Sequence, residues 1–316
     1  MQEEDRLDFL SRIASMYYEQ GMTQRHISAE LGYSRSAISR FLTEAREAGI
    51  VEIRIHHPRE RSSELERDLT EAFGLKQVRV FVRRSLTYAQ TMQRLGSIGA
   101  RLLEQVIRDE SIVGVGWGSG VYEVIDALRP RQRPDIRVIQ LAGTVGLADP
   151  RLDGPELARR LSGLFGGRYQ TLATPLVVDD PATRDALIRD SHIRDALTLA
   201  RDVEVALVNL NSLDARKSSL TDAGYLTRSE YSEITEAGAV GSVCAVHYDH
   251  NGQMLDSPLT HRLIGVTAET LQSIPLTLSV VGGQDKAQAV LGAIRGGLIN
   301  CLVTDDETAR TLVDHA

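Results

Sequence analysis

Apolar residues in the first fifty positions recur at helical spacing and predict three short helices. Residues 7–17 place apolar side chains three and four positions apart, and two shorter stretches on either side of Gly32 do the same. Thr23 and Ser34 stand where their hydroxyls can cap the second and third helices, and glycine enters the left-handed turn between them at little steric cost. Residues 48–55, AGIVEIRI, then alternate apolar and polar side chains, as a half-exposed strand does. Three helices and a strand are the plan of a winged helix-turn-helix domain, which reads DNA.

The third helix carries a polar face opposite its apolar stripe. Short hydroxyls and guanidinium groups on that face are the side chains that reach base edges and phosphates in a major groove. The candidate DNA contacts are Arg35, Ser36, Ser39, Arg40 and Thr43. From Ser34 to Arg46 three arginines face the single acid Glu44, so the local potential is positive. The alternative is a helical hairpin with a solvated face, because generic helix-turn-helix patterns have many false positives.

From Gln77 onward the pattern changes to strands that alternate with helices, which predicts an open, twisted α/β sheet covered on both faces. The expected strands are residues 78–82, 112–115, 136–141, 169–173, 203–210, 243–247, 276–281 and 299–303. The long expected helices are residues 87–108, 155–165, 181–201 and 284–296. Ligands in such folds bind beyond the carboxyl ends of the strands. The predicted organisation is therefore a DNA-binding domain at 1–57, a linker helix at 58–76 and an effector and oligomerisation domain at 77–316.

The linker helix has a narrow apolar stripe of Leu65, Leu69 and Phe73 at four-residue spacing. A solvated linker accounts for the charges around this stripe. A contact with a second subunit accounts for the stripe itself and suits a regulator that reads paired half-sites. We expect a linker that also helps two subunits to pair.

Composition narrows the class of protein. The 316 residues are 42% apolar and 25% charged, as in a soluble globular chain, and the acidic N-terminus leads into no apolar run that would indicate a signal peptide or a membrane span. The two cysteines lie in apolar stretches without zinc spacing, which indicates core packing in a reducing cytoplasm and no metal site. The net charge of −7 predicts weak non-specific DNA binding, so specific contacts and a dimeric or larger assembly must supply the affinity.

One strand end is rich in glycine. The strand 112–115 runs into Gly116-Trp117-Gly118-Ser119-Gly120, and an amphipathic helix follows. Such a turn lets backbone amides converge on an anion at the positive helix N-terminus, and Ser119 adds a hydroxyl. The alternative is a tight turn in which Ser119 only caps its own helix. The spacing is neither that of a Rossmann motif nor that of a P-loop, so no nucleotide cofactor is indicated.

A second strand end places Lys286 in the first turn of a helix, after Gly282-Gly283. The helix dipole disfavours a cation there unless an anion lies beside it. Lysine is also scarce in this chain, which has three lysines. An exposed surface lysine is the alternative, but two anion-seeking features at strand ends support each other and favour a phosphate.

The run MTQRHISAELGYSRSAISRFLTEAREAGIVEIRI closely resembles the DNA-binding domain of the SorC family, bacterial transcription regulators that pair a helix-turn-helix with a sugar-phosphate-sensing domain. Ser28 is a small departure, because the family usually has alanine there. The rest of the chain is also similar, in GVGWGSGVYEVIDAL, GRYQTLATPLVVDDPATRDAL, SLTDAGYLT and GGQDKAQAVLGAIRGGLINCLVTDDETA. The family's effector domain is similar in fold to sugar-phosphate isomerases and amino-sugar-phosphate deaminases but serves as a sensor.

The resemblance implies roles for particular residues and a tetrameric assembly. It assigns the effector phosphate to Gly116, Gly118, Ser119 and Gly120, with Lys286 as the paired charge. It also places Gln140 in contact with the sugar. Ser242 departs from the family, which commonly has aspartate at that position, and this leaves the identity of the sugar open.

We therefore expect a transcriptional regulator of carbohydrate metabolism whose operator binding responds to a phosphorylated sugar, with no cofactor and no catalytic residues. The alternative is a sugar-phosphate isomerase or deaminase with an appended DNA-binding domain, which would need a carboxylate or histidine base over the sugar. The sequence offers no motif for such a base. His247, Asp249 and His250 fit a strand turn, DHNG, better than a metal site, and Asp256, Ser257 and His261 make a triad only if geometry brings them together. A third possibility is an α/β domain that serves only oligomerisation.

Overall fold

The chain folds as two compact units, Met1–Pro58 and Arg59–Ala316. The computed structural model describes residues 3–51, 61–213 and 219–316. No helix in these ranges is both long enough and apolar enough to cross a membrane.

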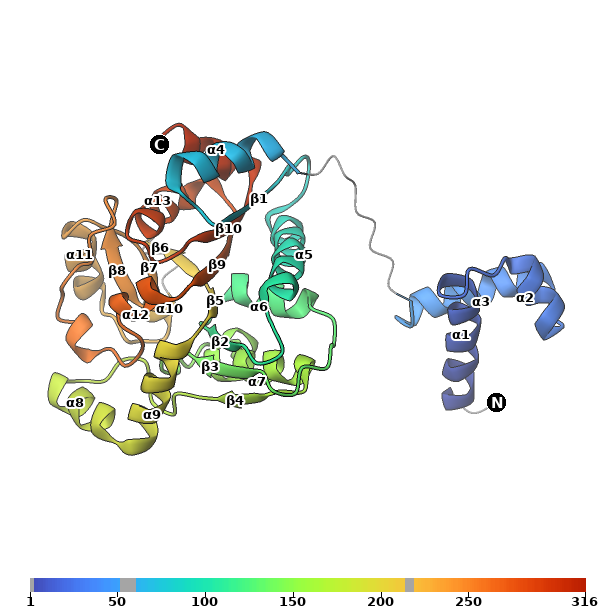
Figure 1. Cartoon of the computed structure of the whole chain (residues 1–316), viewed down its shortest axis with the longest axis horizontal. Helices are drawn as coiled ribbons and strands as arrows, with labels where there is room; N and C mark the ends of the chain where they lie inside the picture. The colour runs from blue at the N-terminus through green and yellow to red at the C-terminus, as the bar shows by residue number, and fades with distance from the viewer. Residues whose placement is uncertain (1–2, 52–60, 214–218) are drawn as a thin grey trace. The chain divides into compact units, whose positions relative to one another are not determined.

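The smaller unit contains α1 (Glu3–Tyr18), α2 (Gln24–Leu31) and α3 (Arg35–Glu47) (Figure 1). Ile13, Ile27 and Ile38, one from each helix, are fully buried in a common core. The predicted caps are confirmed, because the Thr23 hydroxyl accepts the amide hydrogen of His26 and the Ser34 hydroxyl accepts that of Ala37. Gly32 has a φ of 73°, the left-handed conformation that ends α2. Only the beginning of the strand expected near 51–55 falls inside the described residues, and Val51 belongs to no strand.

The larger unit is built on a parallel sheet in which seven strands are described, in the order β1-β10-β9-β5-β2-β3-β4. Their bounds are β1 (Gln77–Phe81), β2 (Ile112–Val115), β3 (Arg137–Gln140), β4 (Arg168–Gln170), β5 (Val205–Val208), β9 (Leu276–Val281) and β10 (Cys301–Asp305). The chain builds outward from β2 through β3 to β4, then returns to the other side of β2 and builds outward through β5, β9 and β10. The direction of winding therefore reverses between β2 and β5, and ligands of such sheets bind at this point, beyond the carboxyl ends of the strands.

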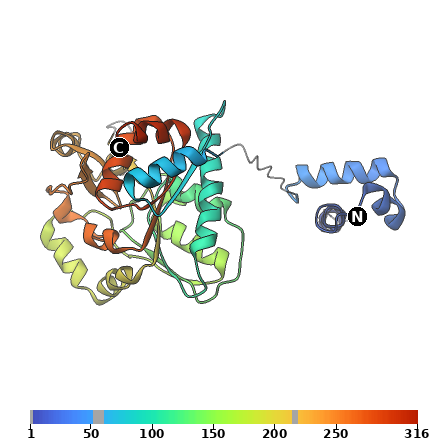
Figure 2. The ribbon, with the colours of Figure 1, turned by 45° about the horizontal axis from the view of Figure 1, so that its top comes forward.

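Helices cover both faces of this sheet, as predicted for an open α/β fold (Figures 1 and 2). One face packs against α5 (Tyr88–Val106), α6 (Ser119–Ala127) and α7 (Gly154–Phe165). The other packs against α4 (Ser63–Phe73), α13 (Ala287–Arg295) and α14 (Asp306–Val313). The remaining helices are α8 (Pro181–Arg189), α9 (Ser191–Leu199), α10 (Ser219–Asp222), α11 (Arg228–Glu236) and α12 (Ala268–Ser273).

A second, antiparallel sheet of β6 (Leu210–Ser212), β7 (Ala239–Val243) and β8 (Val246–Asp249) adjoins the first. The expected strand 243–247 is wrong, because the chain turns in its middle. Cys244 and Ala245 have φ values of 49° and 64° and form a tight hairpin turn between β7 and β8. The next turn is confirmed, since the amide of Gly252 donates to the carbonyl of Asp249.

The helix expected at 181–201 is two helices. The Asp190 carboxylate accepts the amide hydrogens of His192 and Ile193, so it caps α9 directly after α8 has ended. The helix expected at 284–296 begins instead with the short 3-10 turn Gln284–Lys286, and α13 follows it. The strands expected at 112–115 and 276–281 have the observed bounds.

The apolar stripe of α4, which is expected from the sequence to help two subunits to pair, packs against the core of its own larger unit. Leu69 is fully buried in the core beneath the sheet, and Leu65 and Phe73 pack against that core. The helix lies against β1 and α14. The stripe is therefore satisfied within one chain, and α4 belongs structurally to the α/β unit.

Candidate functional site

The outer face of α3 is exposed, as the predicted DNA-reading role requires. Ala37, Ile38, Leu42 and Ala45 face the core, whereas the five predicted contact residues, Arg35, Ser36, Ser39, Arg40 and Thr43, are exposed. The structure therefore places these five side chains together on one surface of one helix.

Two arginines on this face have no side-chain partner among the described residues. The charge of the nearby acid, Glu44, is balanced by an ion pair with Arg6. Arg35 and Arg40 make no ion pair or hydrogen bond through their side chains within the described part of the chain. Glu44 accepts two hydrogen bonds from the Arg6 guanidinium, at 2.9 and 2.5 Å, and this pairing lowers the pKa of the carboxyl group. The positive charge of the face is thus not opposed by Glu44.

Ser28 strengthens the joint between α2 and α3. Its hydroxyl donates to the carbonyl of Tyr33, at 2.5 Å, across the turn that connects the two helices. The serine that departs from the family pattern is therefore accommodated, and it adds a hydrogen bond that alanine could not make.

In the larger unit, the glycine-rich turn lies where the winding of the sheet reverses. Gly116 follows β2, and Ser119 and Gly120 begin α6. Gly118 has a φ of 110°, and a Cβ atom there would lie 2.8 Å from the side chain of Asn209, which follows β5. A Cβ atom on Gly120 would lie 2.6 Å from the carbonyl oxygen of Val280 in β9. The glycines are needed because α6 begins in close contact with the next two strands.

The three glycine amides are already hydrogen-bonded within the chain. The amide of Gly116 donates to the carbonyl of Leu207 at 2.9 Å, and that of Gly118 donates to the carbonyl of Leu152 at 2.8 Å. The amide of Gly120 donates to Oδ1 of Asn209 at 3.3 Å. The hydrogen bonds of these three amides therefore hold the loop in place, and the amides do not converge on an open anion site.

Ser119 is the polar side chain of this turn that remains available. It is exposed at the first position of α6, and its hydroxyl has no hydrogen-bond partner among the described residues. The alternative in which Ser119 caps α6 does not apply, since Gly118 is the N-cap residue and supplies no side-chain bond. A hydroxyl at a helix N-terminus is well placed to meet a phosphate.

Lys286 lies at the same edge of the sheet, after β9. It ends the 3-10 turn that leads into α13, and its Nζ donates to the hydroxyl of Tyr88 at 3.0 Å. The ammonium also lies 5.6 Å from the centroid of the Tyr88 ring. Tyr88 is the first residue of α5 and is exposed, so an aromatic hydroxyl that the sequence pattern did not single out accompanies the predicted cation.

Gln140, the residue expected to contact the sugar, is buried rather than open to solvent. Its side chain is 2% exposed. Its Nε2 donates to the carbonyl of Ala142 at 2.5 Å, and its Oε1 accepts the amide of Leu172 at 3.1 Å. Gln140 therefore fastens the end of β3 to the chain after β4, and the direction of its side chain could not be read from its position at a strand end.

Asn209 is the residue at this edge that sequence reasoning missed. It touches Gly118, accepts the amide of Gly120 and donates to Oδ1 of Asn211 at 2.8 Å. Its position could have indicated it, because Asn209 directly follows β5 and ligand contacts in such folds lie beyond the carboxyl ends of the strands.

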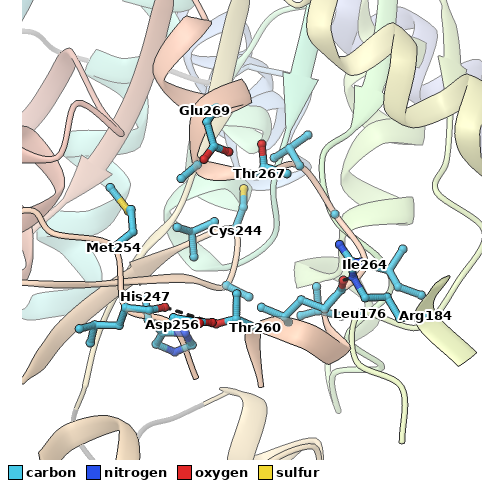
Figure 3. Close-up of a pocket in the computed structure, with 17 residues that line it drawn as sticks. Leu176, Arg184, Cys244, His247, Met254, Asp256, Thr260, Ile264, Thr267 and Glu269 are labelled. Atoms are coloured by element: carbon cyan, nitrogen blue, oxygen red, sulfur yellow. Dashed lines mark hydrogen bonds between the residues drawn. The ribbon is translucent and has the colours of Figure 1, made fainter. Parts of the chain in front are cut away.

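A cavity of about 310 Å³ lies beside the β7–β8 hairpin (Figure 3). Arg184 and Ile264 lie on one side of it, Met254 and His247 on the other, and Cys244 between them. None of the predicted effector contacts lines this cavity. Cys244, which lines the cavity, also lies near the glycine-rich turn, because its Sγ would lie 3.5 Å from a Cβ atom on Gly116.

Burial explains the chemistry of His247 and Cys244, two of the titratable groups that line this cavity. It lowers the pKa of His247 to about 4 and raises the pKa of the Cys244 thiol to about 12. The imidazole is thus neutral and the thiol protonated at pH 7. Both cysteines of the chain are free and buried, as expected for core residues.

The other constellations considered from the sequence do not form reactive sites. His261 contacts the carboxylate of Asp256 at 3.1 Å, but the Ser257 hydroxyl contacts Thr260, so these residues make no triad. Among the described residues no cluster of histidine, cysteine and acidic side chains has the geometry to hold a metal ion.

The chain is similar to one described protein family and to named bacterial regulators. The model of the family described as "Putative sugar-binding domain" matches residues 57–314. The chain is 29% identical over 315 residues to the sorbitol operon regulator of Klebsiella pneumoniae, covering 99% of this chain and 100% of that protein. It is also 29% identical to the deoxyribonucleoside regulator of Bacillus subtilis, covering 95% of this chain and 96% of the relative.

The fold agrees with a solved structure over nearly the whole chain. The crystal structure of the full-length sorbitol operon regulator SorC from Klebsiella pneumoniae superposes with a TM-score of 0.83 at 28% identity. The match covers 97% of this chain and 98% of that one.

Proposed function

We propose that this chain, which belongs to the SorC family of bacterial transcriptional regulators, binds an operator through α3 and adjusts that binding to a phosphorylated sugar held by its α/β unit. Relatives that match it over nearly their whole length are named an operon regulator, a deoxyribonucleoside regulator and a transcriptional regulator, and the family model describes a sugar-binding domain. The observation that carries the proposal is the presence in one chain of an exposed arginine face on α3 and an anion-seeking strand edge in the larger unit.

The proposed DNA contacts are the five exposed residues of α3. Arg35 and Arg40 supply charge for phosphates or guanine edges, and Ser36, Ser39 and Thr43 supply short hydrogen-bonding groups. A dimer is the minimum assembly for an operator with two half-sites, and a tetramer is the expected one. The site of action is the cytoplasm, where the operator lies.

The proposed effector site lies at the reversal point of the sheet. Ser119 and Lys286 would contact the phosphate directly. Gly116, Gly118 and Gly120 would support it by allowing α6 to begin close to β5 and β9, since their amides bond within the chain. Gln140 is left out of the proposed contacts because its side chain is 2% exposed and each end of its carboxamide bonds to the backbone of the chain.

A sensor is favoured over an isomerase or deaminase because two carboxylates near this edge, Asp153 and Asp305, already accept hydrogen bonds from the backbone. Asp153 accepts the amides of Val145, Gly146 and Gly154, and Asp305 accepts those of Gly283 and Thr308. The oxygens of these two carboxylates are engaged by backbone amides and serve to hold loops and helix starts, so neither is free to lie over a sugar carbon as a base. We therefore propose that the chain binds the sugar phosphate without converting it.

A pair of substitutions tests the division of labour between the two units. Arg40→Ala should weaken operator binding and leave sugar-phosphate binding intact, and Lys286→Ala should do the reverse. Each lost contact to a charged group should cost roughly 1.5 to 3 kcal/mol, which is about tenfold or more in affinity. Fluorescence anisotropy with operator DNA and calorimetry with sugar phosphates measure the two effects.

Matched controls come from the same chain. Arg159 pairs with Glu156 on the surface of α7, and Lys76 lies before β1, at the opposite edge of the sheet, where its Nζ donates to the carbonyl of Pro275. Arg159→Ala and Lys76→Ala should change neither affinity. Loss of sugar-phosphate binding in Arg40→Ala would contradict the two-site proposal.

A further inference from the structure

Two carboxamide side chains lie where the chain leaves β5 and enters β6 of the antiparallel sheet. Asn209 directly follows β5, and Asn211 is the middle residue of β6. Both side chains are half-buried. They lie beyond the carboxyl end of β5, beside the point where the winding of the sheet reverses. This is the place where a ligand of such a fold binds.

The hydrogen bonds of the pair tie it to the proposed phosphate loop. Oδ1 of Asn209 accepts the amide of Gly120 at 3.3 Å, and Nδ2 of Asn209 donates to Oδ1 of Asn211 at 2.8 Å. A carboxamide has two donor hydrogens and an oxygen that can accept two bonds. Among the described residues, the second hydrogen of Asn209 and both hydrogens of Asn211 have no acceptor, so the pair has donors to spare.

The cross-strand neighbour of Asn211 is polar and buried, since Ser242 is 4% exposed. Asn211 lies directly opposite Ser242 of β7, so the two side chains share a face of the small sheet. The turn that carries Lys286 lies beside β6. Hydrogen bonds thus link Gly120, Asn209 and Asn211, and Asn211 pairs in register with Ser242.

The chemistry of this surface selects a class of ligand. Carboxamides and a hydroxyl exchange hydrogen bonds with sugar hydroxyls, which are both donors and acceptors. They offer no counter-charge to a carboxylate or an ammonium group, and an unpaired charge placed against them would be disfavoured.

From these contacts we infer that Asn211 reads the uncharged hydroxyl groups of the effector, while Asn209 acts as a positioning residue that holds the phosphate loop through Gly120. The ligand class is a monophosphate of a neutral sugar or polyol. This inference rests on the proposed function, because it assigns specificity within the same site. The competing account is that the two asparagines only fasten β6 to the loop.

The test compares two kinds of ligand in calorimetric titrations of the full-length protein. One is inorganic phosphate, and the other is a panel of neutral sugar and polyol monophosphates with the matching sugar-acid phosphates. Asn211→Leu should reduce the ratio of sugar-phosphate affinity to inorganic-phosphate affinity by about tenfold or more, because only the sugar loses partners. Asn209→Leu should weaken both ligands, because the Gly120 amide loses its acceptor. Asn251→Leu, in the exposed turn after β8, is the matched control and should change neither affinity.

A second variant protects the test against misfolding. Asn211→Asp keeps the shape of the side chain, and its added charge opposes the phosphate of both ligands alike, so a fall in the ratio still reports lost sugar contacts. The inference is overturned if both Asn211 variants keep the wild-type ratio within about twofold, or if the wild-type protein prefers a sugar-acid phosphate. If the wild-type protein binds no sugar phosphate more tightly than inorganic phosphate, the proposed function fails together with the inference.

Discussion

At the scale of single residues, His247 gives the α/β unit a specific sensitivity to acid. Burial lowers the pKa of His247 to about 4 in the folded chain, from 6.5 for an exposed imidazole. Between these values the unfolded chain binds more protons than the folded one, so stability is full above about pH 6.5 and is lost as the pH falls toward 4. The loss from this one group should reach about 2 kcal/mol at pH 5.

Urea unfolding at pH 7 and pH 5 measures this loss. Trp117 is the single tryptophan of the chain and is buried after β2, so its fluorescence reports on the α/β unit. His247→Gln should reduce the difference in unfolding free energy between the two pH values by about 2 kcal/mol. His250→Gln, at an exposed position in the next turn, should leave the difference unchanged. An unaltered pH dependence in His247→Gln would show that another group causes the acid sensitivity.

Single residues also show where sequence reasoning ends. The exposed hydroxyls and arginines of α3 follow from helical spacing, because the residues that fill the core fix which face remains outside. Gln140 and Asn209 both stand at strand ends and both carry carboxamides, yet Gln140 is buried and bonds to the backbone at each end of its side chain, whereas Asn209 is half-buried beside the glycine-rich turn. Local pattern does not distinguish them, because the difference depends on contacts with residues far along the chain.

At the scale of elements, the start of α6 depends on glycine at position 118. Gly118→Ala forces a side chain into a φ of 110° and places its Cβ 2.8 Å from Asn209. The cost should be about 1 to 3 kcal/mol of unfolding free energy, with a parallel loss of sugar-phosphate affinity as the loop shifts. Gly163→Ala, inside α7 with open space around it, should instead stabilise the chain by roughly 0.5 to 1 kcal/mol. Equal behaviour of the two variants in thermal unfolding would contradict the close packing of α6 on β5.

The apolar stripe of α4 provides a second test at this scale. Leu69 is fully buried against the core of the α/β unit, so Leu69→Ala should cost about 2 to 5 kcal/mol of unfolding free energy. The mass of the folded assembly, measured by light scattering, should stay the same. Glu64→Ala, at an exposed position in the first turn of α4, is the control. Dissociation of folded subunits in Leu69→Ala would restore the role in pairing that the stripe suggested.

The elements that the sequence predicted correctly are those whose ends carry a local signal. The helices of the smaller unit have Thr23, Gly32 and Ser34 at their ends, and the structure uses all three as caps. The error at 243–247 arose because Cys244 and Ala245 form a hairpin turn without the asparagine or glycine that such turns favour. Burial of both residues on the core holds them in that conformation, and this tertiary cause has no local mark.

At the scale of the whole molecule, strand order brings separate sequence features to one edge of the sheet. Residues 116–120, 209–211 and 286 are far apart in the chain, but they follow β2, β5 and β9, which are consecutive in the sheet. Parallel strands bring their carboxyl ends to one edge, so these segments meet there. Sequence alone predicted two of the three segments and their shared edge. The strand order, and with it the importance of Asn209, required the structure.

The central claim is that one chain binds DNA through its smaller unit and changes that binding when the larger unit holds a phosphorylated sugar. Such coupling requires that the sugar phosphate bind more tightly to one state of the protein than to the other. Because α3 presents exposed arginines on an otherwise acidic chain, the DNA affinity should also fall steeply with salt.

The most direct test is fluorescence anisotropy of the purified protein with the DNA immediately upstream of its own gene, at two salt concentrations, with and without a panel of sugar phosphates. The account predicts specific, salt-sensitive binding that one sugar phosphate shifts and its unphosphorylated parent does not. Absence of specific DNA binding, together with consumption of a sugar phosphate in the same samples, would contradict it and establish an enzyme instead.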